Sequence, residues 1–340
     1  MRKKFFLQDT RVLKRSWLSL WLNKMGAEVT GFSLKPPTNP SLFDLAEIAK
    51  DMHSIEGDIR NFSLLQEEIK KADPEIIFHM AAQPLVRASY NNPLETYSTN
   101  VMGTVHVHEA AKSCPRLKAF INVTTDKCYE NKERLEGYKE TEALGGYDPY
   151  SNSKACSELI SSAYRQSFEL PVASARAGNV IGGGDWALDR LLPDIYQAYL
   201  DKREVNIRNP KSIRPWQHVL EPLSGYLVLA QKLYADKSLA GAYNFGPDQN
   251  DIQTVEWIVT QITQQWGEGA HFKITSEKGP HEARYLSLNC DKAKQNLNWS
   301  PKWKLSQVLP KISAWYKSIA TAPHRAKELC LAEINEYEKS

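Results

Sequence analysis

The chain has 340 residues, of which 42% are hydrophobic and 24% are charged, and its formal net charge at pH 7 is +3. This length and composition suit one large or two modest globular domains, and no stretch approaches the ~18 uninterrupted apolar residues of a membrane-spanning helix. The lysines and arginines form no basic tract, so nucleic-acid binding has little support. The slight positive charge suits an anionic small substrate.

The cysteine content indicates the compartment of the protein. The five cysteines are odd in number, scattered and free of any C-x-x-C pair. This usage is typical of reduced thiols rather than of a disulfide framework or a metal site. The apolar run Phe5–Leu7 is shorter than the ~7–15 residues of a signal-peptide core. We therefore expect a cytoplasmic protein without a membrane anchor or a bound metal.

Strand-like and helix-like segments alternate through the first half of the chain. The predicted strands are a remnant at Arg11–Leu13, then Glu28–Leu34, Ile76–Phe78, Lys118–Val123 and Val172–Ala175. The predicted helices are Ser16–Met25, Ser41–Lys50, Asn61–Lys71, Pro93–Ser113 and Pro149–Phe168. This alternation predicts an α/β fold with a doubly wound parallel Rossmann sheet of six or seven strands.

The pattern changes after Asn179, where three glycines and several prolines separate shorter segments. We expect a smaller substrate-binding lid over the strand ends. The predicted domains are a dinucleotide-binding domain at 1–180 with returning segments near 215–247, a lid at 181–214 and 248–322, and a C-terminal amphipathic helix at 323–340.

The turn after the first strand departs from the dinucleotide-binding pattern. Such a turn is normally rich in glycine, because bare backbone lets the pyrophosphate approach a helix N-terminus. Here Leu13 passes directly to Lys14-Arg15-Ser16. With Arg11–Leu13 as the strand, about seven residues are missing from the loop. Either the loop is deleted, or the sequence omits a stretch of the natural chain. We favour the second alternative because the other expected catalytic residues are present.

Tyr150 and Lys154 carry the strongest chemical signal. They lie one turn apart in a predicted helix and so face the same way. A lysine ammonium in that position lowers the pKa of a phenol from about 10 toward working pH and can hydrogen-bond a nicotinamide ribose. The run Thr124-Thr125-Asp126-Lys127 ends the predicted strand Lys118–Val123. Together these residues favour a catalytic site over a solvated tyrosine–lysine pair.

Six blocks of sequence resemble the CDP-glucose 4,6-dehydratases, a branch of the extended short-chain dehydrogenases. They are HMAAQPLVRASY (79–90), TYSTNVMGTVH (96–106), TTDKCY (124–129), GGYDPYSNSKACSEL (145–159), RAGNVIGGGDWA (176–187) and RNPKSIRPWQHVLEPLSGYL (208–227). The resemblance covers roughly residues 11–319. In that family the first strand is followed by G-x-x-G-x-x-G and then by S-W-L-S-L-W-L, which stands here at Ser16–Leu22.

The resemblance implies a cycle without net oxidation: hydride passes from sugar carbon 4 to NAD, water is eliminated across carbons 5 and 6, and hydride returns to carbon 6. It implies that Thr125 bonds the 4-hydroxyl beside Tyr150, that Asp126 protonates the leaving 6-hydroxyl, and that Lys127 removes the proton on carbon 5. The dTDP-glucose enzymes have Asp-Glu where this chain has Asp126-Lys127. Epimerases usually lack the pair, yet an epimerase or a dehydratase for another nucleotide stays open, as does a non-catalytic relative if the loop is deleted.

The same resemblance implies binding residues. The cofactor residues are Asp58, Ile59, Ala81, Ala82, Gln83, Thr124, Tyr150 and Lys154. The residues for the nucleotide-diphosphate sugar CDP-glucose are Asn179, Arg208, Arg214, His281 and Arg284. Lys35 stands where an NAD enzyme often has an aspartate, so NADP stays possible. The family also implies deoxysugar synthesis for O-antigen and a homodimer or homotetramer formed through the helices at 93–113 and 149–168.

Overall fold

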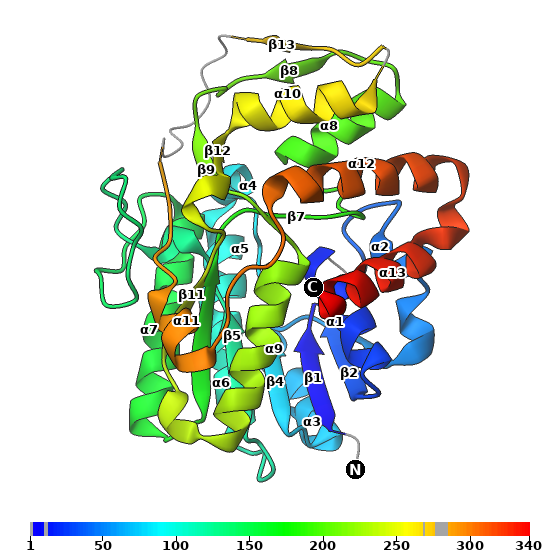
Figure 1. Ribbon diagram of the computed structural model, residues 1–340. Helices are drawn as coiled ribbons and strands as arrows, with labels where there is room; N and C mark the ends of the chain where they lie inside the picture. Colours follow the sequence, from blue (N-terminus) through cyan, green and yellow to red (C-terminus); the bar gives the residue numbers. More distant parts are fainter. Residues whose placement is uncertain (1–2, 10–12, 268, 276–284) are drawn as a thin grey trace.

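The fold is centred on a parallel β-sheet of seven strands (Figure 1). The computed structural model describes residues 3–9, 13–267, 269–275 and 285–340. The strand order is β11-β6-β5-β4-β1-β2-β3, and every neighbouring pair is parallel. The strands are β1 (Lys4–Gln8), β2 (Glu28–Ser33), β3 (His53–Glu56), β4 (Ile76–His79), β5 (Ala119–Val123), β6 (Val172–Ala177) and β11 (Ala242–Phe245). The predicted doubly wound α/β sheet is confirmed.

Helices cover both faces of the sheet, so its central strands are apolar throughout rather than alternating. Successive side chains of a strand point to opposite faces. Phe5 and Leu7 of β1 join the core under α1 and α9, whereas Phe6 joins the core under α3 and α6. These helices are α1 (Leu13–Lys24), α9 (Leu220–Ala235), α3 (Phe62–Ala72) and α6 (Gly103–Ala111), and α7 (Pro149–Ser167) lies beside α6.

Two predicted helices are interrupted. The helix expected at 41–50 is divided into α2 (Leu42–Leu45) and a 3-10 turn at Ile48–Asp51, because Glu47 adopts a left-handed conformation with φ of 49°. The helix expected at 93–113 comprises α5 (Pro93–Tyr97), a π-helical turn (Ser98–Met102) and α6. The other predicted helices and strands of the first half lie within a few residues of their expected ends, apart from the first strand.

The first strand is β1 at Lys4–Gln8, so the predicted strand at Arg11–Leu13 is wrong. Leu13 is instead the first residue of α1. The apolar run Phe5–Leu7, which the sequence analysis compared only with a signal-peptide core, pairs with β2 on one side and β4 on the other. The segment between β1 and α1 therefore begins at Asp9.

This shift also corrects the inferred gap in the cofactor loop. Seven residues, Asp9 to Arg15, separate the end of β1 from the S-W-L-S-L-W-L block that begins at Ser16. A G-x-x-G-x-x-G loop has seven positions, so no residue is missing. Its three glycine positions hold Asp9, Val12 and Arg15, and the first glycine of the chain is Gly26. The loop is present, and its glycines are replaced.

The segments after β6 build a layer above the carboxyl ends of the strands (Figure 1). It contains α8 (Leu191–Leu200), α10 (Val255–Trp266), the antiparallel pair β9 (Ile213–Pro215) and β12 (Ile252–Thr254), and the parallel pair β8 (Val205–Ile207) and β13 (Phe272–Ile274). Between these segments the chain returns to the sheet through α9 and β11. The short strands β7 (Val180–Ile181) and β10 (Gln217–His218) pair where it crosses.

The C-terminal helices pack on the body of the protein. They are α12 (Leu305–Thr321) and α13 (Ala326–Lys339). One stripe of α13 is buried, and Tyr337 packs edge-on against Trp21 of α1 at 5.8 Å between ring centroids. The expected amphipathic helix is thus confirmed. The remaining helices are α4 (Val86–Asn91), α11 (Asp291–Leu297) and 3-10 turns at 126–128, 237–239, 249–251 and 323–325. None of the helices in the described ranges is long and apolar enough to cross a membrane.

Candidate active site

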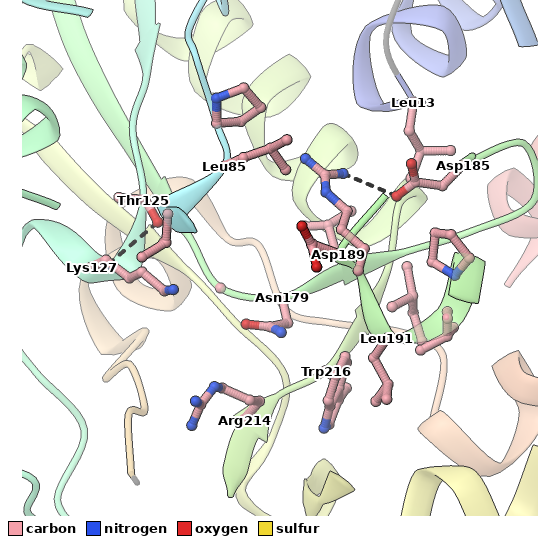
Figure 2. A pocket seen from close by; sticks show the side chains of 18 of the residues that line it. Leu13, Leu85, Thr125, Lys127, Asn179, Asp185, Asp189, Leu191, Arg214 and Trp216 are labelled. Carbon is pink, nitrogen blue, oxygen red and sulfur yellow. Dashed lines mark hydrogen bonds and ion pairs between the residues drawn. The ribbon is translucent and has the colours of Figure 1, made fainter. Parts of the chain in front are cut away.

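A cavity of about 390 Å³ lies between the carboxyl ends of the central strands and the segments above them (Figure 2). Open α/β sheets bind ligands at this edge. Ten of the predicted site residues line the cavity: Ala82, Thr124, Thr125, Asp126, Lys127, Tyr150, Lys154, Asn179, Arg208 and Arg214. The structure thus brings together residues that lie up to 132 positions apart in the sequence, from Ala82 to Arg214.

Thr125 and Asp126 form a buried acidic corner at the end of β5. Thr125 caps the turn at 126–128 by accepting a hydrogen bond from the Lys127 amide at 3.4 Å, and its hydroxyl donates to Asp126 Oδ1 at 3.0 Å. Asp126 Oδ2 is buried without a hydrogen-bond partner among the described residues. Burial raises the pKa of the Asp126 carboxyl, and the charge of Lys127 opposes the rise. A carboxyl in these surroundings favours its protonated form and can donate a proton.

The backbone of the segment after β6 closes this corner. A Cβ on Gly178 would lie 2.4 Å from Pro215 Cγ and 3.1 Å from Asp126 Oδ2, so only a glycine permits this approach. Pro215 belongs to β9, which pairs with β12 above the sheet. Gly178 therefore allows β9 to pack close to the carboxyl of Asp126, which lies in the turn after β5.

Tyr150 and Lys154 project into the cavity from the first turns of α7. Asp148 caps this helix by accepting from the Ser151 amide, and Pro149 occupies the first turn, where it needs no amide partner. Lys154 Nζ donates to the Val123 carbonyl at 3.2 Å. This bond ties α7 to the end of β5.

The protonation of this pair differs from the expectation. Burial raises the pKa of Tyr150 to about 12, whereas the sequence predicted a lowered value. Burial lowers the pKa of Lys154 to about 7, and the charges of Arg15 and Lys14 lower it further. Removal from water disfavours both charged forms, and the two cations add repulsion at the lysine. In the unliganded protein the phenol is therefore neutral, and the amine of Lys154 loses its proton far more readily than an exposed lysine.

A buried ion pair supports the strand that carries these residues. Arg176 of β6 donates to Glu158 Oε2 of α7 at 2.8 Å and to the Tyr129 hydroxyl at 2.7 Å. The Thr124 hydroxyl donates to the other oxygen of Glu158. The side chains of Arg176 and Glu158 are only 4% and 3% exposed. The pair therefore connects α7, β6 and the end of β5 below the cavity.

Comparison with known proteins decides the family. Residues 16–312 match the family model described as GDP-mannose 4,6 dehydratase. The chain is 53% identical to the CDP-glucose 4,6-dehydratase of Salmonella typhimurium over 93% of this chain and 91% of that protein. The chain belongs to the GDP-mannose 4,6-dehydratase family. The resemblance that the sequence blocks indicated is thereby confirmed.

Solved structures show the same fold at low sequence identity. The dTDP-glucose 4,6-dehydratase of Bacillus anthracis, in complex with NAD, is 24% identical with a TM-score of 0.79, covering 93% of this chain and 97% of its own. The UDP-glucuronic acid 4-epimerase of Bacillus cereus, in complex with UDP-glucuronic acid and NAD, is 21% identical with a TM-score of 0.82, covering 93% and 99%. Dehydratases of the family and epimerases thus share this architecture.

The described residues predicted for the sugar nucleotide lie on the side of the cavity that is formed by the segments after β6. Figure 2 shows Asn179, Arg214 and Trp216 around it. Asn179 follows β6, and Arg214 is buried in β9 with Nη1 bonded to the Ile213 carbonyl at 2.9 Å. Arg208 Nη2 lies 3.7 Å from Asp189. His281 and Arg284 lie outside the described residues.

Four predicted cofactor residues lie outside the cavity lining, at the ends of β3 and β4. Asp58 is engaged by Arg60 Nη2 at 2.6 Å, and Ile59 and Ala81 are buried. Gln83 is held by Asn100, whose Oδ1 accepts from the Gln83 amide at 2.8 Å. Sequence reasoning missed Asn100, although the π-helical turn that carries it is a feature often found near functional sites.

Sequence reasoning also missed several cations of the cavity. Lys14, Arg15, Arg87 and Arg190 all line it. Arg190 Nη1 lies 3.0 Å from Asp185, whose charge raises the pKa of the arginine. Burial and then Arg190 lower the pKa of Lys14 to about 8. The available signal was the position of Arg190 three residues after the end of the block RAGNVIGGGDWA, which the family resemblance had already marked.

Proposed function

We propose that this family member is an NAD-dependent CDP-glucose 4,6-dehydratase, which converts CDP-glucose to CDP-4-keto-6-deoxyglucose and water. One observation carries the proposal: a buried carboxyl with a raised pKa, Asp126, lies between Thr125 and Lys127 in the cavity that Tyr150 also enters. Net dehydration needs an acid and a base on neighbouring carbons, and this arrangement offers both.

Bound NAD would supply a hydride acceptor for sugar carbon 4 and a hydride donor for carbon 6, and Tyr150 and Lys154 would hold its nicotinamide end. Tyr150 takes the proton of the 4-hydroxyl, to which Thr125 also bonds. The resulting ketone acidifies the proton on carbon 5, which Lys127 removes. Asp126 gives its proton to the 6-hydroxyl, so that water leaves as the double bond between carbons 5 and 6 forms. As the hydride reaches carbon 6, Lys127 returns its proton to carbon 5. The proton taken by Tyr150 is released and Asp126 takes one up, so that the protein is restored and only water is lost from the sugar.

The residues near the nicotinamide end suit this cofactor. Lys154 lies one turn from Tyr150 on α7, so its amine could hydrogen-bond both the nicotinamide ribose and the phenol. A bound diphosphate would offset the charges of Lys14 and Arg15, which favours the protonated form of Lys154. That ammonium would then stabilise the phenolate of Tyr150. Lys35 is exposed and 3.9 Å from Glu56, and we assign NAD rather than NADP.

We assign the remaining predicted residues to the two nucleotides. The cofactor would contact Asp58, Ile59, Ala81, Ala82, Gln83 and Thr124. The diphosphate of the substrate would contact Asn179, Arg208 and Arg214, with His281 and Arg284 from the part outside the described residues. Residues 181–214 and 248–322 would act as the substrate-binding domain. We also expect a cytoplasmic homodimer or homotetramer, formed through α5–α6 and α7.

The overall reaction is tested with CDP-glucose that carries deuterium at carbon 4. The product should carry that deuterium at carbon 6, because the same cofactor takes and returns the hydride. Turnover is followed by mass spectrometry and compared with dTDP-glucose. Loss of the label to solvent, or preference for dTDP-glucose, would reject the assignment.

The division of labour is tested by separating oxidation from elimination. In Lys127→Ala, oxidation at carbon 4 should persist, while dehydration falls by roughly 10²–10⁴, the usual effect of losing one acid–base group. Exchange of the carbon 5 proton with solvent should fall equally. Asp126→Asn should also block dehydration but keep that exchange, since the base remains. Exposed Lys132, which does not line the cavity, supplies the control variant Lys132→Ala. If Lys127→Ala dehydrates at the control rate, Lys127 is not the base.

A further inference from the structure

Asp9 and Arg15 stand at two of the positions between β1 and the first turn of α1 where a dinucleotide needs bare backbone. The strand order reverses between β1 and β4, and the crevice at their carboxyl ends is the topological switch point of this sheet. In such folds the cofactor diphosphate lies there, at the N-terminus of the helix that follows the first strand. Asp9 directly follows β1, and Met80 directly follows β4. These two residues therefore mark the two sides of the crevice.

The guanidinium of Arg15 bridges the crevice. Its Nη1 donates to Asp9 Oδ2, and its Nη2 donates to the Met80 carbonyl oxygen. The Arg15 side chain is 8% exposed and that of Asp9 is 21% exposed, so the pair is largely shielded from water. Asp9 has a φ of 61°, a left-handed conformation that favours glycine. At Asp9 the backbone therefore has a conformation suited to glycine, although this residue carries a charged side chain.

The pair is unfavourable for an incoming diphosphate in two ways. The carboxylate of Asp9 places a negative charge beside the crevice, and like charges repel strongly where water is excluded. The Arg15 guanidinium, which could attract an anion, is already bonded to Asp9 and Met80. Releasing it leaves Asp9 without its partner, which is costly for a shielded ion pair.

We propose that the Asp9–Arg15 ion pair occupies the diphosphate subsite of the dinucleotide, so that NAD binds only when the pair opens. The inference rests on the proposed function for the identity of the dinucleotide. It implies that the free protein binds NAD weakly, whereas CDP-glucose binds at Asn179 and Arg214 without meeting the pair. The residue at position 15 thus controls cofactor affinity.

The test measures NAD and CDP-glucose binding separately by isothermal titration calorimetry. The double variant Asp9→Gly/Arg15→Gly removes both side chains and leaves no unpaired charge. It should bind NAD about tenfold or more tightly than the unmodified protein, because no ion pair has to open. Its affinity for CDP-glucose should stay unchanged. The control variant Arg116→Gly breaks another arginine–aspartate pair, in which Arg116 Nε lies 2.6 Å from Asp73. Both residues precede strands, β5 and β4, so the pair lies at the amino ends of the sheet, away from the crevice. This variant should change neither affinity.

A conservative variant keeps the test independent of glycine effects on folding. Asp9→Asn retains the shape of the side chain and weakens its hold on Arg15, so NAD should bind several-fold more tightly here too. Unchanged NAD affinity in both variants would overturn the proposal. Weaker NAD binding would overturn it as well, since Arg15 would then be a ligand of the diphosphate. Failure of CDP-glucose to bind any form would reject the proposed function, and the NAD titrations would still judge the ion pair.

Discussion

Replacing Arg176 by methionine should test the buried support of the active site. The change removes the charge that faces Glu158 and keeps an unbranched apolar chain in the space. Glu158 would keep only the hydroxyl of Thr124 as a donor among the contacts described above. A buried carboxylate without its cationic partner is strongly destabilising, whereas a neutral pair in the same place is far less so.

The magnitude follows from the burial of the pair. Removing one partner of a buried ion pair costs about 3–5 kcal/mol, and both side chains here are less than 5% exposed. Arg176 also donates to Tyr129 at 2.7 Å, and a lost hydrogen bond of this kind adds about 1 kcal/mol. We expect Arg176→Met to lower the free energy of unfolding by about 5 kcal/mol, the sum of these two terms. Adding Glu158→Gln should recover about 2 kcal/mol of that loss, and the coupling energy is the sum of the two single losses minus the loss in the double variant.

The assay is equilibrium unfolding in urea, followed by the fluorescence of the nine tryptophans. The unmodified protein, both single variants and the double variant complete the cycle. A loss below about 1 kcal/mol in Arg176→Met would show that Glu158 does not depend on the arginine. A double variant whose loss equals the sum of the single losses would show that the two residues do not interact. Either result would refute the reasoning.

Three further predictions concern the site and its surroundings. Tyr150→Phe should show no reduced-nicotinamide absorbance with substrate, because the 4-hydroxyl proton has no acceptor; oxidation at the normal rate would exclude Tyr150. Since burial lowers the pKa of Lys154 to about 7, the unfolded chain binds a proton that the folded one does not between pH 7 and 10.5, so stability should rise with pH in that window. Between pH 7.5 and 9.5 the free energy of unfolding should rise by about 2 kcal/mol more in the unmodified protein than in Lys154→Met, as measured by urea midpoints. An equal dependence on pH in the two proteins would contradict this. Cys156 is half-buried and the other four cysteines are buried, so one thiol should react rapidly with a disulfide reagent, and none in Cys156→Ser; a second fast thiol would contradict the described packing.

The sequence predicted the sheet well because parallel strands buried on both faces appear as apolar runs between helices. It also predicted the residues around Asp126 and Tyr150, because chemistry-bearing motifs follow the ends of strands. It failed at β1, because a run of only three apolar residues, Phe5–Leu7, did not indicate a strand. That failure produced the false gap, since the length of a loop can be counted only from the true end of its strand.

Other features depend on contacts between distant segments, so the sequence could not reveal them. Burial raises the pKa of Tyr150, and the hydrogen bond with Thr125 and the charge of Arg190, both from distant parts of the sequence, oppose the rise. Arg190 reaches the cavity because the chain after β6 folds back over the strand ends. The contact of Arg15 in α1 with Met80, directly after β4, joins two residues that lie 65 positions apart in the sequence.

The charges of the cavity support a ligand that carries more than one negative charge. Lys14, Arg15, Arg190 and Lys154 line it, and burial and then repulsion from neighbouring cations lower the pKa of Lys14 and Lys154. Such an arrangement is unfavourable in the empty protein, and a bound diphosphate relieves it by restoring the proton on Lys154. The Asp9 carboxylate supplies part of that relief to Arg15 without any ligand. The ion pair can therefore stabilise the unliganded fold while it weakens cofactor binding. Charged residues at the glycine positions of the loop would thus increase stability at the expense of NAD affinity.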